Sequence, residues 1–282
     1  MSLPPSPATD EVEPFVATLI SNERLTLPGS PEDVRRLRFA VDDLDFIGRI
    51  GQCVRIMAPG RFGKPWHERL YSIADMTDGG GFELLVRRCY AIDDFSGERY
   101  DGVASNYLCN LAVGGEVKFT GSHGHPFAIP NDKGAGLLMI GMGTGVAPFR
   151  GLVRRIYEEI GGWEGPVRLF YGARSGLEML YLNDEKADIG LYYDQPTFQA
   201  FKAVSARPHF DEPPELDRAL WERIDEVWAM LTEPRTQVYI AGPETLLPLI
   251  ETPLAHAAGS LERWSQKRAQ LADEGRWHEV LY

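Results

Sequence analysis

The sequence predicts a closed antiparallel β-barrel followed by an α/β domain with a parallel sheet. Residues 13 to about 130 form short β-segments broken by Gly, Pro and Asp, a spacing that favours a closed barrel over βαβ units. After residue 133, apolar strands alternate with helical patterns, which indicates a parallel sheet covered on both faces. We therefore expect domains at 13–133 and 134–282, preceded by a disordered tail at 1–12.

The individual elements follow from the same patterns. The strands expected in the barrel are Phe15–Ser21, Arg36–Val41, Cys53–Met57, Leu70–Ala74, Phe82–Arg88 and Glu116–Gly121. The strands expected in the second domain are Gly136–Gly141, Val167–Tyr171, Phe198–Ser205 and Gln237–Ala241. Helical spacing predicts helices at Pro148–Ile160, Leu216–Leu231, Leu246–Ala258 and Leu261–Leu271.

Composition and charge exclude several classes of function. The chain has 282 residues, of which 44% are hydrophobic and 25% charged, as in soluble globular proteins. Its net charge of −12 argues against general nucleic-acid binding. No apolar run reaches the ~18 residues that span a bilayer, so we expect no membrane insertion. The start of the chain lacks the basic and apolar regions of a secretory signal.

The arginines in the first half of the chain have two possible interpretations. They form either a basic patch for an acidic protein partner or an ordinary solvated surface.

The cysteines and histidines indicate neither a disulfide framework nor a metal site. The three cysteines are Cys53, Cys89 and Cys109, and no CxxC pair occurs. We expect all three to be buried, small apolar side chains, and we expect a cytoplasmic location. The six histidines lack metal-ligand spacing, so no metal is predicted.

The segment Arg69-Leu70-Tyr71-Ser72 carries the groups that a flavin mononucleotide moiety needs. Alternate residues of a strand share a face, so Arg69 and Tyr71 point one way and Leu70 and Ser72 the other. A guanidinium binds a phosphate, an aromatic ring pairs with the flavin ring, and a hydroxyl hydrogen-bonds near its reactive nitrogen. Taken alone, the segment is more simply an amphipathic strand with a surface arginine.

Small and polar residues lead into an apolar helical turn at Gly102–Leu108. Backbone N–H groups at a helix start bind anions, and the helix dipole strengthens this binding. Ala104, Ser105 and Asn106 therefore form a candidate pyrophosphate site. The alternative is that Ser105 simply caps the helix, and the two roles are compatible.

The segment Gly141-Met142-Gly143-Thr144-Gly145 follows an apolar strand and precedes a helix. It is not the six-position dinucleotide fingerprint, because no glycine lies three residues after Gly145. It is not a Walker loop either, because no Lys-Ser/Thr follows. Glycines let the backbone approach a ligand closely, and open parallel sheets bind ligands at the carboxyl ends of their strands. We therefore expect a nucleotide phosphate at this loop.

Two later segments point to the same edge of the sheet. Gly242-Pro243-Glu244 follows the last predicted strand, and a central parallel strand would place this tip beside Gly143, where a nicotinamide ring fits. The sequence stops on the aromatic residue Tyr282. Because termini normally fray, a terminal ring predicts docking, either stacked over a planar cofactor or anchoring the last strand.

In this order, the motifs resemble those of the plant-type ferredoxin–NADP reductase family over nearly the whole chain after residue 13. The segments that carry the resemblance are RLYS, GVASNYLCNLAVGGEVKFTG, GMGTGVAPFRG, YGAR, YIAGPETL and the terminal tyrosine. The resemblance implies an antiparallel Greek-key β-barrel that binds FAD and an α/β domain that binds NADP, with NAD as the alternative nucleotide. It also implies ferredoxin or flavodoxin as the partner.

The resemblance also implies roles for individual residues. Tyr71 and Tyr282 would sandwich the isoalloxazine ring, and Ser72 would hydrogen-bond near flavin N5, where hydride arrives. The implied catalytic residues are Ser72, Glu279 and Tyr282. With the motifs above, the cofactor-binding residues are Arg69, Leu70, Tyr71, Ser72, Arg87, Tyr90, Ala104, Ser105, Asn106, Gly143, Thr144, Gly145, Arg174, Ser205, Arg207, Gly242, Pro243, Glu244 and Tyr282.

Four departures from the family pattern bear on the site. Ala241 stands where the family has a cysteine, and Ala104 replaces a sulfur-containing residue at the pyrophosphate turn. The arginine of the 2′-phosphate site is displaced by one position to Arg207, and residues 210–213 supply neither the usual lysine nor the usual tyrosine. Preference for NADP over NAD therefore stays open. The acidic residue of the tail is shifted, which leaves Glu279 as the candidate carboxylate.

Three functions are compatible with these features. The first is an FAD-dependent oxidoreductase that exchanges electrons between NADP(H) and a one-electron carrier, ferredoxin or flavodoxin. The second is the NAD(P)H-dependent reductase component of an oxygenase or other multicomponent system, whose iron–sulfur carrier must be a separate protein because the chain has no cysteine cluster. The third is a non-enzymatic nucleotide-binding module on the same fold.

Overall fold

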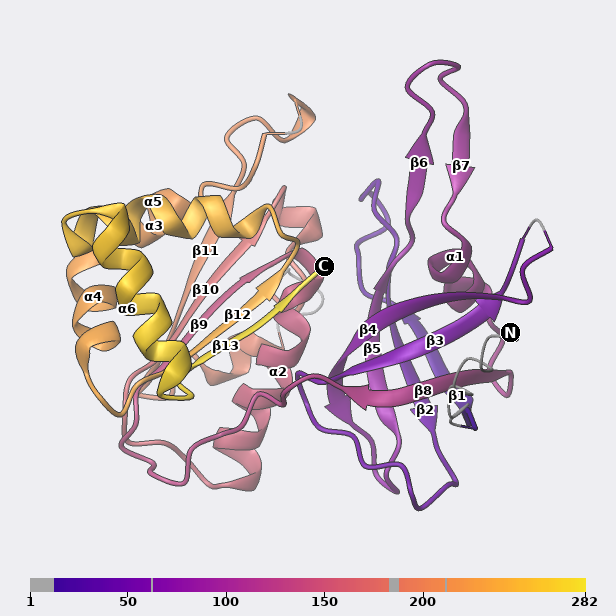
Figure 1. Cartoon of the computed structure of the whole chain (residues 1–282), viewed down its shortest axis with the longest axis horizontal. Coiled ribbons are helices and arrows are strands. Elements are labelled where there is room, and N and C mark those ends of the chain that lie inside the picture. The colour runs from indigo at the N-terminus through magenta and orange to yellow at the C-terminus, as the bar shows by residue number, and fades with distance from the viewer. Residues whose placement is uncertain (1–12, 62, 183–187, 211) are drawn as a thin grey trace, which may run out of the picture.

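A computed structural model describes residues 13–61, 63–182, 188–210 and 212–282 and places a β-barrel beside an α/β domain (Figure 1). The C-terminus lies between the two domains. The predicted fold class is confirmed. The predicted disordered tail at 1–12 lies outside the described residues.

Six antiparallel strands close the barrel in the order β1-β2-β5-β4-β3-β8. They are β1 (Phe15–Arg24), β2 (Val34–Ala40), β3 (Cys53–Pro59), β4 (Trp66–Met76), β5 (Phe82–Arg87) and β8 (Glu116–His123). Around the barrel the order skips from β2 to β5 and from β3 to β8, as Greek-key connections do. Alternate strand residues point inward, and Phe39, Phe82 and Phe119 are fully buried there.

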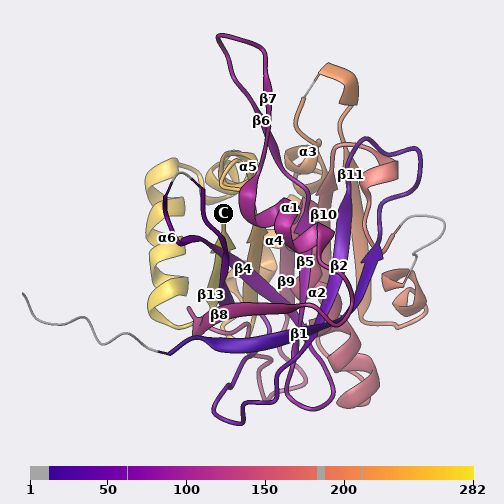
Figure 2. The ribbon, with the colours of Figure 1, turned by 90° about the vertical axis from the view of Figure 1, so that its right-hand side faces the viewer.

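A hairpin that the sequence analysis did not predict follows β5. Its strands are β6 (Tyr90–Ile92) and β7 (Arg99–Asp101), and it projects from the barrel as a narrow arm (Figures 1 and 2). All of its strand residues are exposed, so it lacks the apolar alternation by which a half-buried strand is recognised. Helix α1 (Val103–Asn110) follows at its base.

The second domain contains a five-stranded parallel sheet in the order β11-β10-β9-β12-β13. Its strands are β9 (Leu137–Met142), β10 (Val167–Ala173), β11 (Phe198–Val204), β12 (Gln237–Gly242) and β13 (Trp277–Leu281). In β9, Met139 joins the apolar cluster on one face and Leu138 and Ile140 join the cluster on the other. Burial on both faces explains why this strand is a continuous apolar run.

Helices cover both faces of the sheet. They are α2 (Val146–Arg154), α3 (Leu216–Trp221), α4 (Ile224–Thr232), α5 (Leu246–Ala258) and α6 (Leu261–Asp273). Helix α2 lies on the face toward the barrel, and α3 to α6 pack on the opposite face. None of the helices in the described ranges is long and apolar enough to cross a bilayer.

Two helix predictions were wrong in detail. The helix expected at 148–160 ends at Arg154 and continues as a π-helical turn over Arg155–Glu159. The helix expected at 216–231 is interrupted at Arg223, whose φ is −127°. The Arg223 guanidinium lies 4.8 Å from the centre of the Phe201 ring. This tertiary contact has no signature in the helical periodicity.

The interface between the domains is packed like a core. Ile50, Ala74 and Leu85 of the barrel side share one buried cluster with Phe149 of α2. A Cβ atom on Gly151 would lie 2.6 Å from the carbonyl oxygen of Ala74, so only glycine lets α2 approach β4 this closely. This packing favours a defined relative position of the two domains.

We expect His278 of β13 to make the stability of the α/β domain pH-dependent. Its ring stacks on Tyr239 at 5.1 Å, and burial lowers its pKa below the ordinary value of 6.5, with a smaller effect from His125. Its stabilising contribution is therefore complete above about pH 6.5 and is lost as the pH falls toward the lower folded-state pKa. We expect His278→Gln to reduce the loss of stability between pH 8 and pH 5.5, measured by urea unfolding. An unchanged pH dependence would contradict this assignment.

Candidate active site between the two domains

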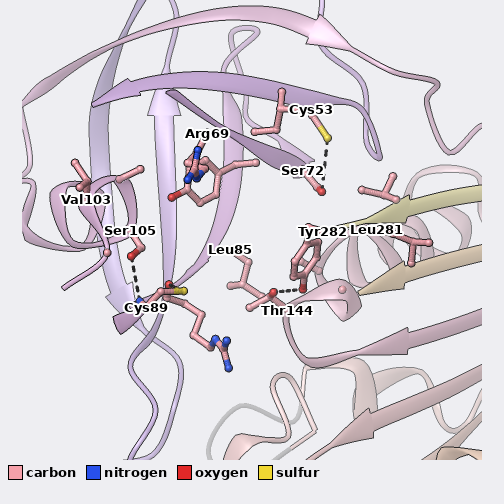
Figure 3. Close-up of a pocket in the computed structure, with 18 of the residues that line it drawn as sticks. Cys53, Arg69, Ser72, Leu85, Cys89, Val103, Ser105, Thr144, Leu281 and Tyr282 are labelled. Atoms are coloured by element: carbon pink, nitrogen blue, oxygen red, sulfur yellow. Dashed lines mark hydrogen bonds between the residues drawn. The ribbon is translucent and has the colours of Figure 1, made fainter. Parts of the chain in front are cut away.

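A cavity of about 620 Å³ lies between the barrel and the carboxyl edge of the sheet. Strand β4 and helix α1 contribute its barrel side, and the loop after β9, the end of β12 and the chain end contribute the other side. Figure 3 shows Arg69 and Ser105 toward one end of the cavity and Ser72, Thr144 and Tyr282 toward the other. The volume is within the range of about 300–1,000 Å³ that small-molecule sites span.

The predicted flavin strand forms part of the barrel wall. Arg69, Leu70, Tyr71 and Ser72 of β4 all line the cavity. The Nη1 atom of Arg69 donates to the carbonyl oxygen of Glu68 at 3.1 Å, and within the described ranges its guanidinium has no carboxylate partner. Burial raises the pKa of Tyr71, so its phenol stays neutral. The wall therefore combines an aromatic side chain with a cation that is available to an anionic ligand.

Two cysteines belong to this wall, contrary to the prediction that all three are buried. Cys53 is half-buried and Cys89 is exposed, and both line the cavity. The Sγ atom of Cys53 donates to the Oγ atom of Ser72 at 3.8 Å (Figure 3). Burial raises the pKa of Cys53, so it remains a thiol and keeps this donor. Cys109 is buried as predicted.

The N-terminus of α1 also faces the cavity, which Gly102, Val103, Ala104 and Ser105 line. The N-cap residue, Gly102, supplies no side-chain hydrogen bond, so the first-turn N–H groups lack an intrahelical partner and can bind an anion. Ser105 does not cap the helix: its Oγ atom accepts from the Cys89 N–H at 3.0 Å (Figure 3). The capping alternative was therefore wrong.

The glycine-rich loop after β9 packs directly against the end of β12. It forms the 3₁₀ turn η1 (Gly143–Gly145), in which Gly143 has a left-handed φ of 58°. A Cβ atom on Gly145 would lie 2.0 Å from the carbonyl oxygen of Ala241. Thr144 and Gly145 line the cavity at the edge where parallel sheets bind ligands.

Tyr282 is docked at this loop. Its hydroxyl hydrogen-bonds with the Oγ1 atom of Thr144 (Figure 3). Its N–H donates to the Gly242 carbonyl oxygen at 3.2 Å, and its carbonyl oxygen accepts from the Glu244 N–H at 3.2 Å. The residue lines the cavity and is still 56% exposed. The chain end is therefore anchored by its backbone and by its hydroxyl.

Glu279 does not reach the cavity, although its neighbours Val280 and Leu281 line it. The Oε2 atom of Glu279 accepts from Arg268 Nη2 at 2.8 Å and from Trp277 Nε1 at 2.8 Å. Its carboxylate is thus engaged against helix α6. This geometry speaks against the predicted catalytic role, and we leave Glu279 out of the candidate site.

Arg174, Ser205 and Arg207 gather at the carboxyl ends of β10 and β11, outside the cavity lining. The Ser205 N–H donates to the Arg174 carbonyl oxygen at 3.2 Å, and the Arg207 N–H donates to Ser205 Oγ at 3.1 Å. Arg174 pairs with Glu178 at 3.0 Å, and Arg207 pairs with Glu212. The structure thus brings together these three predicted cofactor-binding residues, each arginine with a carboxylate partner.

The remaining predicted residues divide into two groups. Arg87 and Tyr90 line the cavity. Arg87 lies 3.8 Å from the carboxylate of Glu32, and the Arg99 guanidinium lies 4.3 Å from the centre of the Tyr90 ring. The predicted residues outside the lining are Asn106, Gly143, Gly242, Pro243 and Glu244. Among them, Asn106 has a structural role, since its Nδ2 atom donates to the carbonyl oxygens of Cys89 and Gly102.

The sequence analysis missed several lining residues, including Leu85, Tyr100 and Pro148. Tyr100 reaches the cavity because β7 pairs with β6, with Ala91 opposite Tyr100 and Tyr90 opposite Asp101. The aromatic residues at 90 and 100 were the available signal, but the exposed hairpin gave no apolar pattern to connect them.

Two family models match the chain. The Oxidoreductase FAD-binding domain covers residues 23–127, and the Oxidoreductase NAD-binding domain covers residues 139–252. The first match falls on the barrel side of the cavity and the second on the glycine-rich side. Fold and site therefore define a flavin- and nicotinamide-dependent oxidoreductase.

The ferredoxin–NADP reductase of Spirulina sp is 32% identical to this chain over 283 aligned residues, which cover 95% of each protein. A chloroplastic root isozyme of ferredoxin–NADP reductase from Oryza sativa subsp. japonica is 32% identical and covers 99% of this chain and 78% of its own. The chain belongs to the ferredoxin–NADP reductase family. The predicted enzyme class and the cofactors FAD and NADP are confirmed by these matches.

A solved structure shows the same fold. The ferredoxin–NADP+ reductase from Plasmodium falciparum superposes with a TM-score of 0.71 at 20% identity, over 95% of this chain and 96% of that one.

Proposed function

We propose that this protein exchanges electrons between NADP(H) and ferredoxin through FAD bound in the cavity. The observation that carries the proposal is the position of the cavity, where a barrel wall with an available cation faces the glycine-rich loop of the sheet. Bound flavin supplies the ability to take up two electrons together from a nicotinamide and release them singly. Flavodoxin is the second candidate carrier. A cytoplasmic location stays a prediction.

The donors in the cavity support FAD as the resident group. We assign the FAD phosphates to Arg69 and to the first-turn N–H groups of α1, because a guanidinium and a helix N-terminus both favour anions. We assign the isoalloxazine ring to the end near Tyr71 and Tyr282, with Ser72 beside its reactive edge. We further propose that the FAD-binding domain spans residues 13–133 and the nucleotide-binding domain residues 134–282.

On the nucleotide side, we assign the pyrophosphate to Thr144, Gly145 and Arg87. We assign the 2′-phosphate of NADP to the cluster of Ser205, Arg174 and Arg207. Both arginines pair with carboxylates of the chain, so a bound phosphate has to compete with them for the guanidinium donors. This competition weakens the preference for NADP over NAD.

Anaerobic titration of the purified yellow protein tests the proposed function. We expect NADPH to bleach the flavin absorbance, and we expect reduced ferredoxin to be formed in a coupled assay with NADPH. Parallel assays with NADH and with flavodoxin measure the nucleotide and carrier preferences. A colourless protein that FAD does not load, or flavin that NADPH leaves oxidised, contradicts the proposal. Reduction by NADPH without transfer to either carrier favours a reductase component of a multicomponent system.

Replacement of the available cation tests the FAD phosphate site. We expect Arg69→Ala to weaken FAD binding about 10- to 100-fold, because a hydrogen bond to a charged group contributes about 1.5–3 kcal/mol. FAD dissociation is measured by flavin fluorescence after dilution. Arg55→Ala is the matched control: Arg55 lies on neighbouring β3 and pairs with Glu68 at 3.5 Å, but it does not line the cavity. Equal FAD affinity in the two variants would refute the assignment.

A further inference from the structure

A buried ionic cluster joins the two domains beside the cavity. The carboxylate of Asp75, on β4, is 7% exposed. Its oxygens accept from Arg150 Nη1 at 3.2 Å, from Arg154 Nε at 3.1 Å and Nη2 at 3.0 Å, and from the Met76 N–H at 2.9 Å. The two arginines lie one helical turn apart on α2, so a single barrel carboxylate holds one face of this helix.

The cluster connects the two walls of the cavity. Asp75 follows Ser72 by three residues on β4, and Arg150 follows Pro148 by two residues on α2. Ser72 and Pro148 both line the cavity. The Cβ position of Gly151, between the two arginines, is 2.6 Å from the Ala74 carbonyl oxygen. Strand and helix are therefore in contact where the ion pairs form, and a shift between them displaces the two walls.

The apolar part of the interface brings the two domains together, but it does not orient polar groups. Hydrophobic contact is non-directional, so the buried side chains around Ile50 and Phe149 supply contact rather than direction. The paired hydrogen bonds from Arg154 to Asp75 are directional and bidentate, a geometry that adds orientation as well as energy. Buried ion pairs often contribute little net stability, which leaves positioning as the effect that this geometry supplies.

We propose that Asp75, held by Arg150 and Arg154, is a positioning residue that sets the register of β4 against α2 and thereby the alignment of nicotinamide and flavin for hydride transfer. This inference rests on the proposed function, in which both rings meet in the cavity. Asp75 touches neither ring and acts through Ser72 on one wall and the start of α2 on the other.

One substitution removes the Asp75 carboxylate and leaves both arginines with other carboxylate partners. In Asp75→Asn, Arg150 keeps the carboxylate of Asp188 at 2.9 Å and that of Glu83 at 4.0 Å, and Arg154 keeps Glu159 at 3.3 Å. No buried guanidinium is left without an acid, so we expect the variant to fold. Arg154→Gln is a milder second variant, because the Arg154 side chain is 30% exposed.

We expect Asp75→Asn to lower the limiting rate of flavin reduction by NADPH at least about tenfold, since small misplacements of reacting groups are costly, and Arg154→Gln to lower it less. FAD content and the KM for NADPH should change little. The flavin difference spectrum on adding NADP+ is a measurement that does not depend on turnover. We expect its amplitude to fall in both variants. Glu226→Gln is the control, because Glu226 pairs with the similarly buried Arg168 and belongs to α4, on the sheet face away from the barrel.

Flavin reduction within about twofold of the wild-type rate, with an unchanged difference spectrum, would overturn the inference. If Asp75→Asn does not fold, the rate of flavin reduction and the difference spectrum of Arg154→Gln test the inference instead. A parallel loss of rate in Glu226→Gln would also overturn it, because general destabilisation would then explain the effect. Failure of wild-type flavin to accept electrons from NADPH would contradict the proposed function itself, a result distinct from equal rates in wild type and variants.

Discussion

Replacement of Tyr282 by alanine is expected to tighten nucleotide binding, by up to about tenfold, and to lower the turnover number while FAD stays bound. The side chain lies in the cavity and hydrogen-bonds with Thr144, so an incoming nucleotide must displace it from the loop. Aromatic stacking contributes about 0.5–1.5 kcal/mol, which corresponds to roughly 2- to 12-fold in affinity. Turnover should fall because a nucleotide that binds more tightly is released more slowly.

The measurements are the Kd for NADP+ from flavin difference spectra, the steady-state kcat with NADPH, and the FAD content after gel filtration. Tyr282→Phe is the matched control, because it keeps the ring and removes only the hydroxyl that contacts Thr144. We expect Tyr282→Phe to change affinity much less than Tyr282→Ala. Identical kinetics and affinity in Tyr282→Ala and wild type would show that the ring does not compete with the nucleotide.

Replacement of Gly145 by alanine is expected to destabilise the α/β domain by about 3 kcal/mol, near the upper end for overpacking. The added Cβ atom would lie 2.0 Å from the Ala241 carbonyl oxygen, 2.3 Å from its carbonyl carbon and 2.7 Å from the Gly242 nitrogen. All three atoms belong to the backbone, so no side-chain rotation relieves the clash, and the tips of β9 and β12 have to separate. Nucleotide affinity should fall with stability, because Thr144 and Gly145, to which we assign the nucleotide pyrophosphate, lie at these tips.

Substitutions at two other glycines of the same domain distinguish a steric clash from backbone strain as the cause of the destabilisation. Gly143→Ala adds a Cβ atom in open space but at a φ of 58°, which costs roughly 1–2 kcal/mol. Gly176→Ala adds one in open space with no such φ and should be close to neutral. Thermal unfolding and NADP+ titration should therefore rank the damage as Gly145, then Gly143, then Gly176. Equal stability of Gly145→Ala and Gly176→Ala would disprove the close contact.

The sequence predicted the parts of the site that depend on short segments. Strand alternation indicated flavin-binding groups at residues 69–72, and the glycine-rich loop indicated a phosphate site at residues 141–145. The structure places all of residues 69–72 at the cavity, together with Thr144 and Gly145 of the loop. The order of motifs indicated the family, and the matches confirm it. The hairpin at 90–101 was missed, because an exposed two-stranded arm has no buried face and therefore no apolar alternation.

The sequence alone could not predict in which direction the side chains of some motif residues point. Glu279 is near the expected place in the tail, but its carboxylate bonds with Arg268 on α6 rather than facing the cavity. Ser105 is at the expected helix start, yet its hydroxyl is bonded to the Cys89 N–H across the loop. In both cases the partner is supplied by another segment, and motif spacing carries no information about it.

The amino-acid sequence determined the order of elements, the chemistry of the phosphate-binding segments and the class of cofactors. These properties rest on local backbone preferences and on periodicities of two and 3.6 residues. Only the tertiary structure decided that Asp75 meets Arg150 and Arg154, and that Thr144 meets Tyr282. These partners are 75, 79 and 138 residues apart in the chain. The contacts of Asp75 arise only when the two domains pack together, and the Thr144–Tyr282 contact arises only when the chain end packs against the sheet of its own domain. In both cases the packing of the folded chain fixes which distant side chains meet.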